Sequence, residues 1–113
     1  MTGCLFCRIA AGQLPAKIVY RSSDIVAFHD IAPQAPTHIL VIPVKHIGSA
    51  NDLQAGDRDL IGQLLIAATQ IAREQHLDQG YRFVINTGPQ GGLSVDHLQI
   101  HILGGRHMRW PPG

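Results

Sequence analysis

The chain has 113 residues, of which 45% are apolar and 15% charged, so length and composition predict one globular domain over residues 1–113. Nine basic and eight acidic residues give a formal charge of +1 without a basic stripe, which excludes a protein that wraps nucleic acid. The apolar stretch 5–11 is too short for a membrane span and lacks the cationic segment of an export signal, so we expect a cytosolic protein with reduced cysteines and no membrane partner.

The first half of the chain predicts one short helix and three strands. The helix covers residues 4–10, in which the two cysteines lie three positions apart and therefore on one face. The first two strands should pair as a hairpin, since a sequence with turn composition separates them. The strands are β-prone runs bounded by turn residues or proline, at 18–20, 25–28 and 38–42.

The second half contains one long helix, predicted at 57–76 because apolar residues recur there at helical spacing. Strands are predicted at 81–86 and 96–103, and the glycine- and proline-rich segment 87–93 between them is predicted to be a loop. Strands on both sides of one helix indicate an α+β fold, in which that helix covers one face of an antiparallel sheet. The opposite face is then free for chemistry.

Residues 97–103 alternate strictly between polar and apolar side chains. In a strand, His97, Gln99 and His101 would share one face and the apolar residues between them the other. Two histidines on that face slightly favour a functional site, although an ordinary solvated strand shows the same alternation. The glycine-rich loop 88–92 before this strand allows backbone N–H groups to approach an anion, with a plain turn as the equal alternative.

Longer segments carry a specific resemblance. The segments 30–43 (DIAPQAPTHILVIP) and 97–106 (HLQIHILGGR) are followed by a WPPG tail at 110–113. In their order and separation these segments resemble the Hint branch of the histidine-triad (HIT) superfamily over nearly the whole chain. The resemblance implies a HIT-like fold: a five-stranded antiparallel sheet with one long helix and a short N-terminal helix. It also implies a homodimer that binds purine nucleoside monophosphates, on a scaffold that in many members hydrolyses nucleoside phosphoramidates or aminoacyl adenylates.

The resemblance assigns residues to the two neutral parts of a bound nucleotide. Asp30 would accept hydrogen bonds from the ribose hydroxyls, a role that suits a carboxylate. The apolar slot for the base would be formed by Phe6, Ile9, Phe28 and Ile31. For Phe28 and Ile31, ordinary core packing is an equally good interpretation.

The resemblance also implies which residues lie near the phosphate and at the subunit boundary. Trp110 would reach toward the site of the partner subunit. The residues expected along the phosphate are Asn86, Gly92, Ser94, Gln99 and His101.

In the family, the middle of three alternating histidines attacks phosphorus to form a nucleotidyl-histidine intermediate, and the last orients the phosphate and the leaving group. Gln99 occupies the middle position here, and a carboxamide has no basic nitrogen at neutral pH to form that bond, although it can hydrogen-bond a phosphate oxygen. We therefore predict binding with weak or absent turnover, the alternative being a hydrolase that uses His101 or an activated water. The implied catalytic positions are Gln99, His101, His97, His38 and Ser94.

Two further positions depart from the family pattern. Leu93 stands where relatives usually carry a glutamine beside the glycine loop, and Asp96 replaces a common aromatic residue. Loss at Leu93 as well as at Gln99 favours natural divergence over deliberate substitution of a single histidine.

Two cysteines alone are too few ligands for a tetrahedral metal site. In HIT proteins that keep this cysteine pair, a structural zinc is completed by two histidines, so the resemblance implies the ligand set Cys4, Cys7, His46 and His97, with two buried thiols as the alternative. Zinc at His97 would remove that residue from acid–base chemistry and leave His38 to support the site, unless His38 is only a buried core histidine. A zinc-stabilised interaction module with vestigial nucleotide binding is a third hypothesis.

Overall fold

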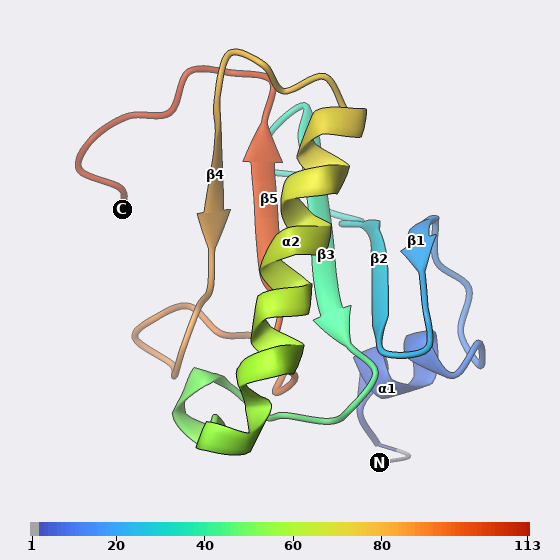
Figure 1. Ribbon diagram of the computed structural model, residues 1–113. Coiled ribbons are helices and arrows are strands. Elements are labelled where there is room, and N and C mark those ends of the chain that lie inside the picture. The colour runs from blue at the N-terminus through green and yellow to red at the C-terminus, as the bar shows by residue number, and fades with distance from the viewer. Residues whose placement is uncertain (1–2) are drawn as a thin grey trace.

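The computed structural model describes residues 3–113, which form one five-stranded sheet (Figure 1). Neighbouring strands are antiparallel, and their spatial order is β1-β2-β3-β5-β4. The predicted α+β class and the antiparallel sheet are therefore confirmed. The strands are β1 (Ile18–Arg21), β2 (Ile25–His29), β3 (Thr37–Pro43), β4 (Tyr81–Val84) and β5 (Ile100–Gly104).

The helices lie on opposite faces of this sheet. The long helix α2 (Arg58–Glu74) crosses the face formed by β3 and β5 (Figure 1). The short helix α1 (Leu5–Ala10) packs against the other face. Two 3-10 helices, η1 (Ala50–Asp52) and η2 (Ala55–Asp57), connect β3 to α2 and were not predicted. Over residues 3–113, none of the helices combines the length and apolar character that crossing a membrane requires.

The strand side chains alternate between two hydrophobic cores, one on each face of the sheet. In β3, Ile39 and Val41 pack beneath α2, whereas Leu40 and Ile42 pack with α1. In β5, Ile102 lies in the α2 core, so its neighbour His101 faces the α1 side. The side chain of His101 therefore lies on the same face of the sheet as α1.

The strand predicted at 96–103 begins later than expected, because β5 starts only at Ile100. Pro43 has no N–H with which to extend the β3 ladder toward this segment. The N–H of Leu98 donates instead to the carbonyl of Ile47 at 2.6 Å. The prediction of strand structure at 96–99 was therefore wrong, and β4 likewise ends at Val84 instead of 86.

The long helix predicted at 57–76 is confirmed with shorter ends. His76 adopts the left-handed φ of 59°, and the N–H of Leu77 donates to the carbonyl of Ala72 at 3.1 Å, a bonding pattern that closes a helix. At the other end, the Asp57 carboxylate accepts from the Gln54 N–H at 2.9 Å and from the Lys45 ammonium at 2.8 Å. These bonds fix the turn from which α2 starts.

We expect Leu64→Ala to lower the free energy of unfolding by about 2–5 kcal/mol, because the side chain is fully buried in the α2 core and its removal leaves a cavity. Leu65→Ala is the matched control, since Leu65 is 41% exposed and its loss should cost less than about 1 kcal/mol. Urea denaturation at neutral pH measures both values. Equal losses would contradict this description of the core.

Candidate functional site

A pocket of about 500 Å³ opens on the α1 face of the sheet, within the size range of small-molecule sites. We call it the α1 pocket. Part of its wall is a row of side chains that pair across three adjacent strands, formed by Phe28 of β2, Leu40 of β3 and His101 of β5. Most residues of the pocket lining are apolar. The polar residues of the whole lining are His29, Asp30, Ser94, Gln99 and His101.

All four residues predicted for the base slot line this pocket. The rings of Phe6 and Phe28 meet edge to face, with their centroids 5.4 Å apart, and both side chains are buried, as is Ile9. Ile31 is 100% exposed, so the alternative that it packs in the core is wrong. Phe28 belongs to the α1 core and also lines the pocket, so both interpretations of Phe28 are compatible with the structure.

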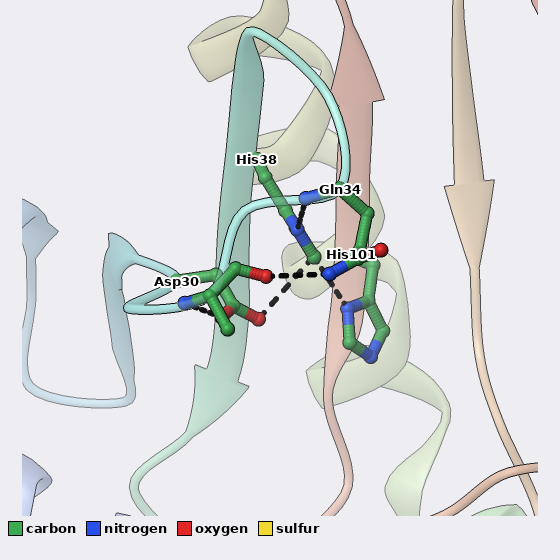
Figure 2. Close-up of polar contacts among 5 residues, drawn as sticks. Asp30, Gln34, His38 and His101 are labelled. Atoms are coloured by element: carbon green, nitrogen blue, oxygen red, sulfur yellow. Dashed lines mark hydrogen bonds and ion pairs between the residues drawn. The ribbon is translucent and has the colours of Figure 1, made fainter.

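Beside the pocket, Asp30, His38 and His101 form a connected group (Figure 2). Nε2 of His38 lies 2.9 Å from Nδ1 of His101 and 3.4 Å from a carboxylate oxygen of Asp30. On the other side of the ring, Nδ1 of His38 lies 3.0 Å from the backbone nitrogen of Gln34. The second carboxylate oxygen of Asp30 accepts the N–H of Ala32 at 2.8 Å.

These contacts fix the positions of the protons on both rings. A backbone N–H can only donate, so Nδ1 of His38 accepts from Gln34 and carries no proton. Neutral His38 must then be protonated at Nε2, from which it donates to Nδ1 of His101. Neutral His101 in turn carries its proton on Nε2. The imidazole that lines the α1 pocket therefore has an N–H donor remaining for a ligand.

Both rings favour the neutral form. Burial lowers the pKa of His38, which the neighbouring Asp30 carboxylate raises only in part. Burial also lowers the pKa of His101, with a further decrease from the adjacent His38 and an opposing effect of Asp30. At neutral pH the pair therefore behaves as two neutral hydrogen-bonding groups.

Gln99 lies between His101 and the loop before β5 and is buried. Its amide nitrogen donates to the carbonyl oxygens of Val95 at 3.1 Å and His97 at 3.0 Å. Carbonyl oxygens can only accept, so the nitrogen end of the Gln99 amide must face Val95 and His97. Both amide hydrogens are then used within the protein. The group that Gln99 has left for a ligand is its own carbonyl oxygen, an acceptor. The expected amide donation to a phosphate oxygen is therefore not available in this conformation.

The residues predicted along the phosphate do not all meet at one place. Ser94 lines the α1 pocket together with Gln99 and His101. Asn86 and Gly92 lie beside one another in the preceding loop, outside the described lining of the pocket. Trp110 is 82% exposed in the C-terminal tail.

The structure adds His29 to the lining of the pocket and Gln34 to the hydrogen bonding of the site, neither of which the sequence suggested. Gln34 acts through its backbone N–H, a group that every residue except proline has, so its side-chain type carried no signal.

Four predicted metal ligands converge at the start of α1. The sulfur of Cys4 lies 3.3 Å from Nδ1 of His97, and the sulfur of Cys7 lies 3.2 Å from Nδ1 of His46 and 3.5 Å from that of His97. A tetrahedral zinc with bonds of about 2.0–2.3 Å places its ligand atoms about 3.3–3.8 Å apart. The spacing of the four side chains therefore suits zinc.

The hydrogen bonding of His97 also suits a metal ligand. Nε2 of His97 lies 2.8 Å from the carbonyl of Pro43, an acceptor, so this nitrogen carries the proton and Nδ1 keeps a free lone pair facing the sulfurs. Burial and the neighbouring Cys4 thiol raise the pKa of Cys7. Metal binding at this centre would therefore release thiol protons.

The group of Asp30, His38 and His101 is also compact enough to surround an ion. Its hydrogen bonding argues against a metal, because the only nitrogen of neutral His38 that faces the group carries a proton. The two histidine clusters thus have different chemistry. His97 lies in the cysteine cluster that could hold a metal, whereas His101 lines the α1 pocket and His38 contacts His101.

Comparison with known proteins is consistent with this geometry. A model of the HIT domain matches residues 11–108. An uncharacterized HIT-like protein of Synechococcus elongatus is 50% identical over 109 residues, which cover 96% of each chain. A 14 kDa zinc-binding protein of Brassica juncea is 44% identical over 111 residues, covering 96% of this chain and 98% of that protein. The crystal structure of a HIT family hydrolase from Legionella pneumophila, 49% identical, matches with a TM-score of 0.97 and covers 98% of this chain and 100% of its own. The predicted HIT-like fold is confirmed.

We expect His38 and His101 to stay neutral in the folded protein at pH values just below 6.5, the ordinary histidine pKa, because burial lowers the pKa of both. In the urea-unfolded chain both should titrate near 6.5. As the pH falls, the unfolded chain therefore takes up protons on these two histidines before the folded protein does. The free energy of unfolding keeps their full contribution above about pH 6.5 and loses it as the pH falls toward the lowered pKa values of the folded protein. Histidine carbon chemical shifts measured by NMR across this range test the expectation. A folded-state midpoint at or above that of the unfolded chain would contradict it.

Proposed function

The chain belongs to the HIT domain family, and we propose that it is a Hint-branch protein that binds purine nucleoside monophosphates with weak or absent hydrolysis. The observation that carries the proposal is the α1 pocket, an apolar slot bordered by the Asp30 carboxylate and the His101 N–H donor, with Gln99 at the position of the family nucleophile. HIT family proteins typically bind nucleotides and are often dimers.

The shape and polarity of the pocket suit a nucleoside. The edge-to-face pair of Phe6 and Phe28, with the exposed Ile31, provides apolar surface for a planar base. One carboxylate oxygen of Asp30 accepts from the N–H of Ala32, and the other lies 3.4 Å from Nε2 of His38, whose proton points to His101. Both oxygens keep a lone pair, so the carboxylate is able to accept from vicinal ribose hydroxyls.

The phosphate would be held by neutral donors. The Nε2–H of His101 and the hydroxyl of Ser94 both belong to the lining of the pocket. Asn86 and Gly92, which lie beside one another next to the pocket lining in sequence but outside it in the structure, would approach the phosphate from the segment between β4 and β5. Trp110, which is 82% exposed, would contact the site of a partner subunit.

Weak turnover follows from the chemistry of Gln99. The family reaction forms a bond between an imidazole nitrogen and phosphorus, and the leaving group departs with a proton. The lone pair of an amide nitrogen is delocalised into its carbonyl, and both N–H groups of Gln99 already donate to Val95 and His97. No nitrogen at this position is able to attack phosphorus. Hydrolysis would then require direct attack by water and should be slower by orders of magnitude.

The metal centre would hold a structural zinc. The ligand spacing, the lone pair of His97 and the free thiols of Cys4 and Cys7 all support this assignment. Zinc would tie the start of α1, which lines the pocket, to the loops that carry His46 and His97. A cytosolic location stays a prediction that fits two reduced thiols.

A homodimer would use the edge of the sheet formed by β4. In the described chain this strand pairs only with β5, so its outer edge has backbone groups available for a second copy. Tyr81 on this strand and Ile85 just after it are exposed. These features support the family's dimeric arrangement for this protein.

In a single-turnover assay with an adenosine phosphoramidate, we expect Gln99→His to react at least about a hundredfold faster than the natural chain, because it restores the nucleophile. Affinity for adenosine monophosphate, measured by calorimetry, should change little. Gln99→Asn is the matched control, since it keeps a carboxamide and should stay inactive.

Comparable turnover in the natural chain and Gln99→His would contradict the proposed role of Gln99. If His101→Ala abolished that turnover, the alternative hydrolase mechanism would be supported. Stoichiometric zinc without measurable nucleotide affinity would instead favour an interaction module.

We expect the purified protein to contain about one zinc ion per chain by elemental analysis. Cys7→Ala should lose the metal and melt at a lower temperature, because binding of a structural zinc contributes directly to folding. His107→Ala, an exposed histidine outside the centre, should keep the zinc and the melting temperature. A natural chain that remained metal-free after incubation with zinc would overturn the assignment.

A further inference from the structure

We propose that the backbone of Gln34 and the side chain of Arg106 are positioning groups that fix the direction of the hydrogen-bond chain ending at His101. Neither residue lines the α1 pocket. Through this chain they would decide whether the imidazole facing the ligand offers a donor or an acceptor. The consequence for phosphate binding rests on the proposed function, whereas the proton positions do not.

The hydrogen-bond chain begins at Arg106, two residues after the end of β5. Its Nε and Nη2 groups donate to the carbonyl oxygen of Gln34 at 3.2 and 3.1 Å. A guanidinium is always protonated and has no acceptor, so this contact can have only one direction. The two bonds hold the carbonyl of Gln34, and with it the Cα that also carries the N–H, beside the residues that follow β5.

The turn that carries Arg106 packs closely against the loop between β2 and β3, which contains Gln34. Gly105 has a left-handed φ of 89°, and a Cβ atom there would lie 2.9 Å from Cβ of Pro36. Only glycine combines this conformation with such a close approach. Within the loop, the Gln34 side chain also donates to the carbonyl of Ala32 at 2.9 Å. The backbone N–H of Gln34 is therefore held from several sides.

The N–H of Gln34 then sets the proton on His38 (Figure 2). While this N–H donates to Nδ1, that nitrogen cannot be protonated without losing the bond and facing a second hydrogen. His38 donates from Nε2 to His101, whose remaining N–H faces outward to the ligand. If Nδ1 of His38 gained the proton of the neutral ring, Nε2 would become an acceptor and the bond to His101 would reverse. His101 would then present a lone pair, which repels a phosphate oxygen.

The test uses Gln34→Pro and Gln34→Ala in the full-length chain. Proline removes the backbone N–H and keeps the carbonyl that Arg106 contacts. Alanine keeps both backbone groups and, like proline, loses the exposed side-chain bond to Ala32, so it is the matched control. Long-range proton–nitrogen NMR spectra of histidine-labelled protein report which ring nitrogens carry protons. In the natural chain and in Gln34→Ala, we expect Nδ1 of both His38 and His101 to be unprotonated. In Gln34→Pro, Nδ1 of His38 should become protonated in a measurable fraction of molecules.

Ligand affinities separate a positioning role from general damage to the pocket. Affinity for adenosine monophosphate should fall by about tenfold in Gln34→Pro, the loss of one hydrogen bond to a charged group, and stay within about twofold in Gln34→Ala. Affinity for adenosine, which has no phosphate, should remain nearly unchanged in both. Arg106→Ala should weaken phosphate binding in the same selective way, and Arg106→Lys, which keeps a cationic donor, should recover part of it.

A protonated Nδ1 on His38 in the natural chain would overturn the proposal. This NMR measurement needs no variant, so it tests the proposal even if Gln34→Pro fails to fold. Equal losses of adenosine and adenosine monophosphate affinity would also overturn it, since they indicate a distorted pocket. A natural chain that bound no adenosine monophosphate but showed the expected proton positions would contradict the proposed function alone.

Discussion

The pairing of β3 with β5 is the constraint on which both faces of this molecule depend. Leu40 lies opposite His101, and this pair faces α1. Ile39 lies opposite Ile102, and this pair faces α2. A slip of one residue would send His101 beneath α2 and bring an isoleucine into the pocket. The fully buried residues Ile39, Val41, Ile100 and Ile102 make such a slip costly. The apolar core under α2 therefore holds the polar site on the other face in register.

Two histidine clusters share the α1 face, and the backbone gives them opposite chemistry. A carbonyl, that of Pro43, accepts from His97 and leaves the opposite ring nitrogen free to bind a metal. A backbone N–H, that of Gln34, donates to His38 and leaves the opposite ring nitrogen as a donor. The identical side-chain type thus supports metal binding in one place and ligand hydrogen bonding in the other. The difference lies in which main-chain group faces each ring.

In the proposed function, Gln99 would separate ligand binding from covalent catalysis, two properties that a HIT scaffold usually combines. Binding would depend on the apolar slot, Asp30 and His101, all of which have geometry compatible with a ligand. Covalent chemistry depends on one nitrogen lone pair, and Gln99 has none to offer. Its amide instead donates to the carbonyl oxygens of Val95 and His97 and so holds the loop before β5. These contacts favour the proposal of a protein that binds a ligand without covalent catalysis.

The sequence by itself determined the two α-helices and the five strands, and its resemblance to the HIT family supplied most residues of the site. Helical spacing located α2, β-prone runs located the five strands, and alternation assigned His101 and Gln99 to a common face. The ends of these elements depended on contacts that no local pattern contains: Pro43 stops the ladder, and the left-handed His76 closes α2. Only the tertiary structure brought His46 and His97 to the cysteines and the N–H of Gln34 to His38, because chain segments far apart in sequence meet there. It also decided where the protons reside, since a ring nitrogen takes its role from the backbone group that faces it.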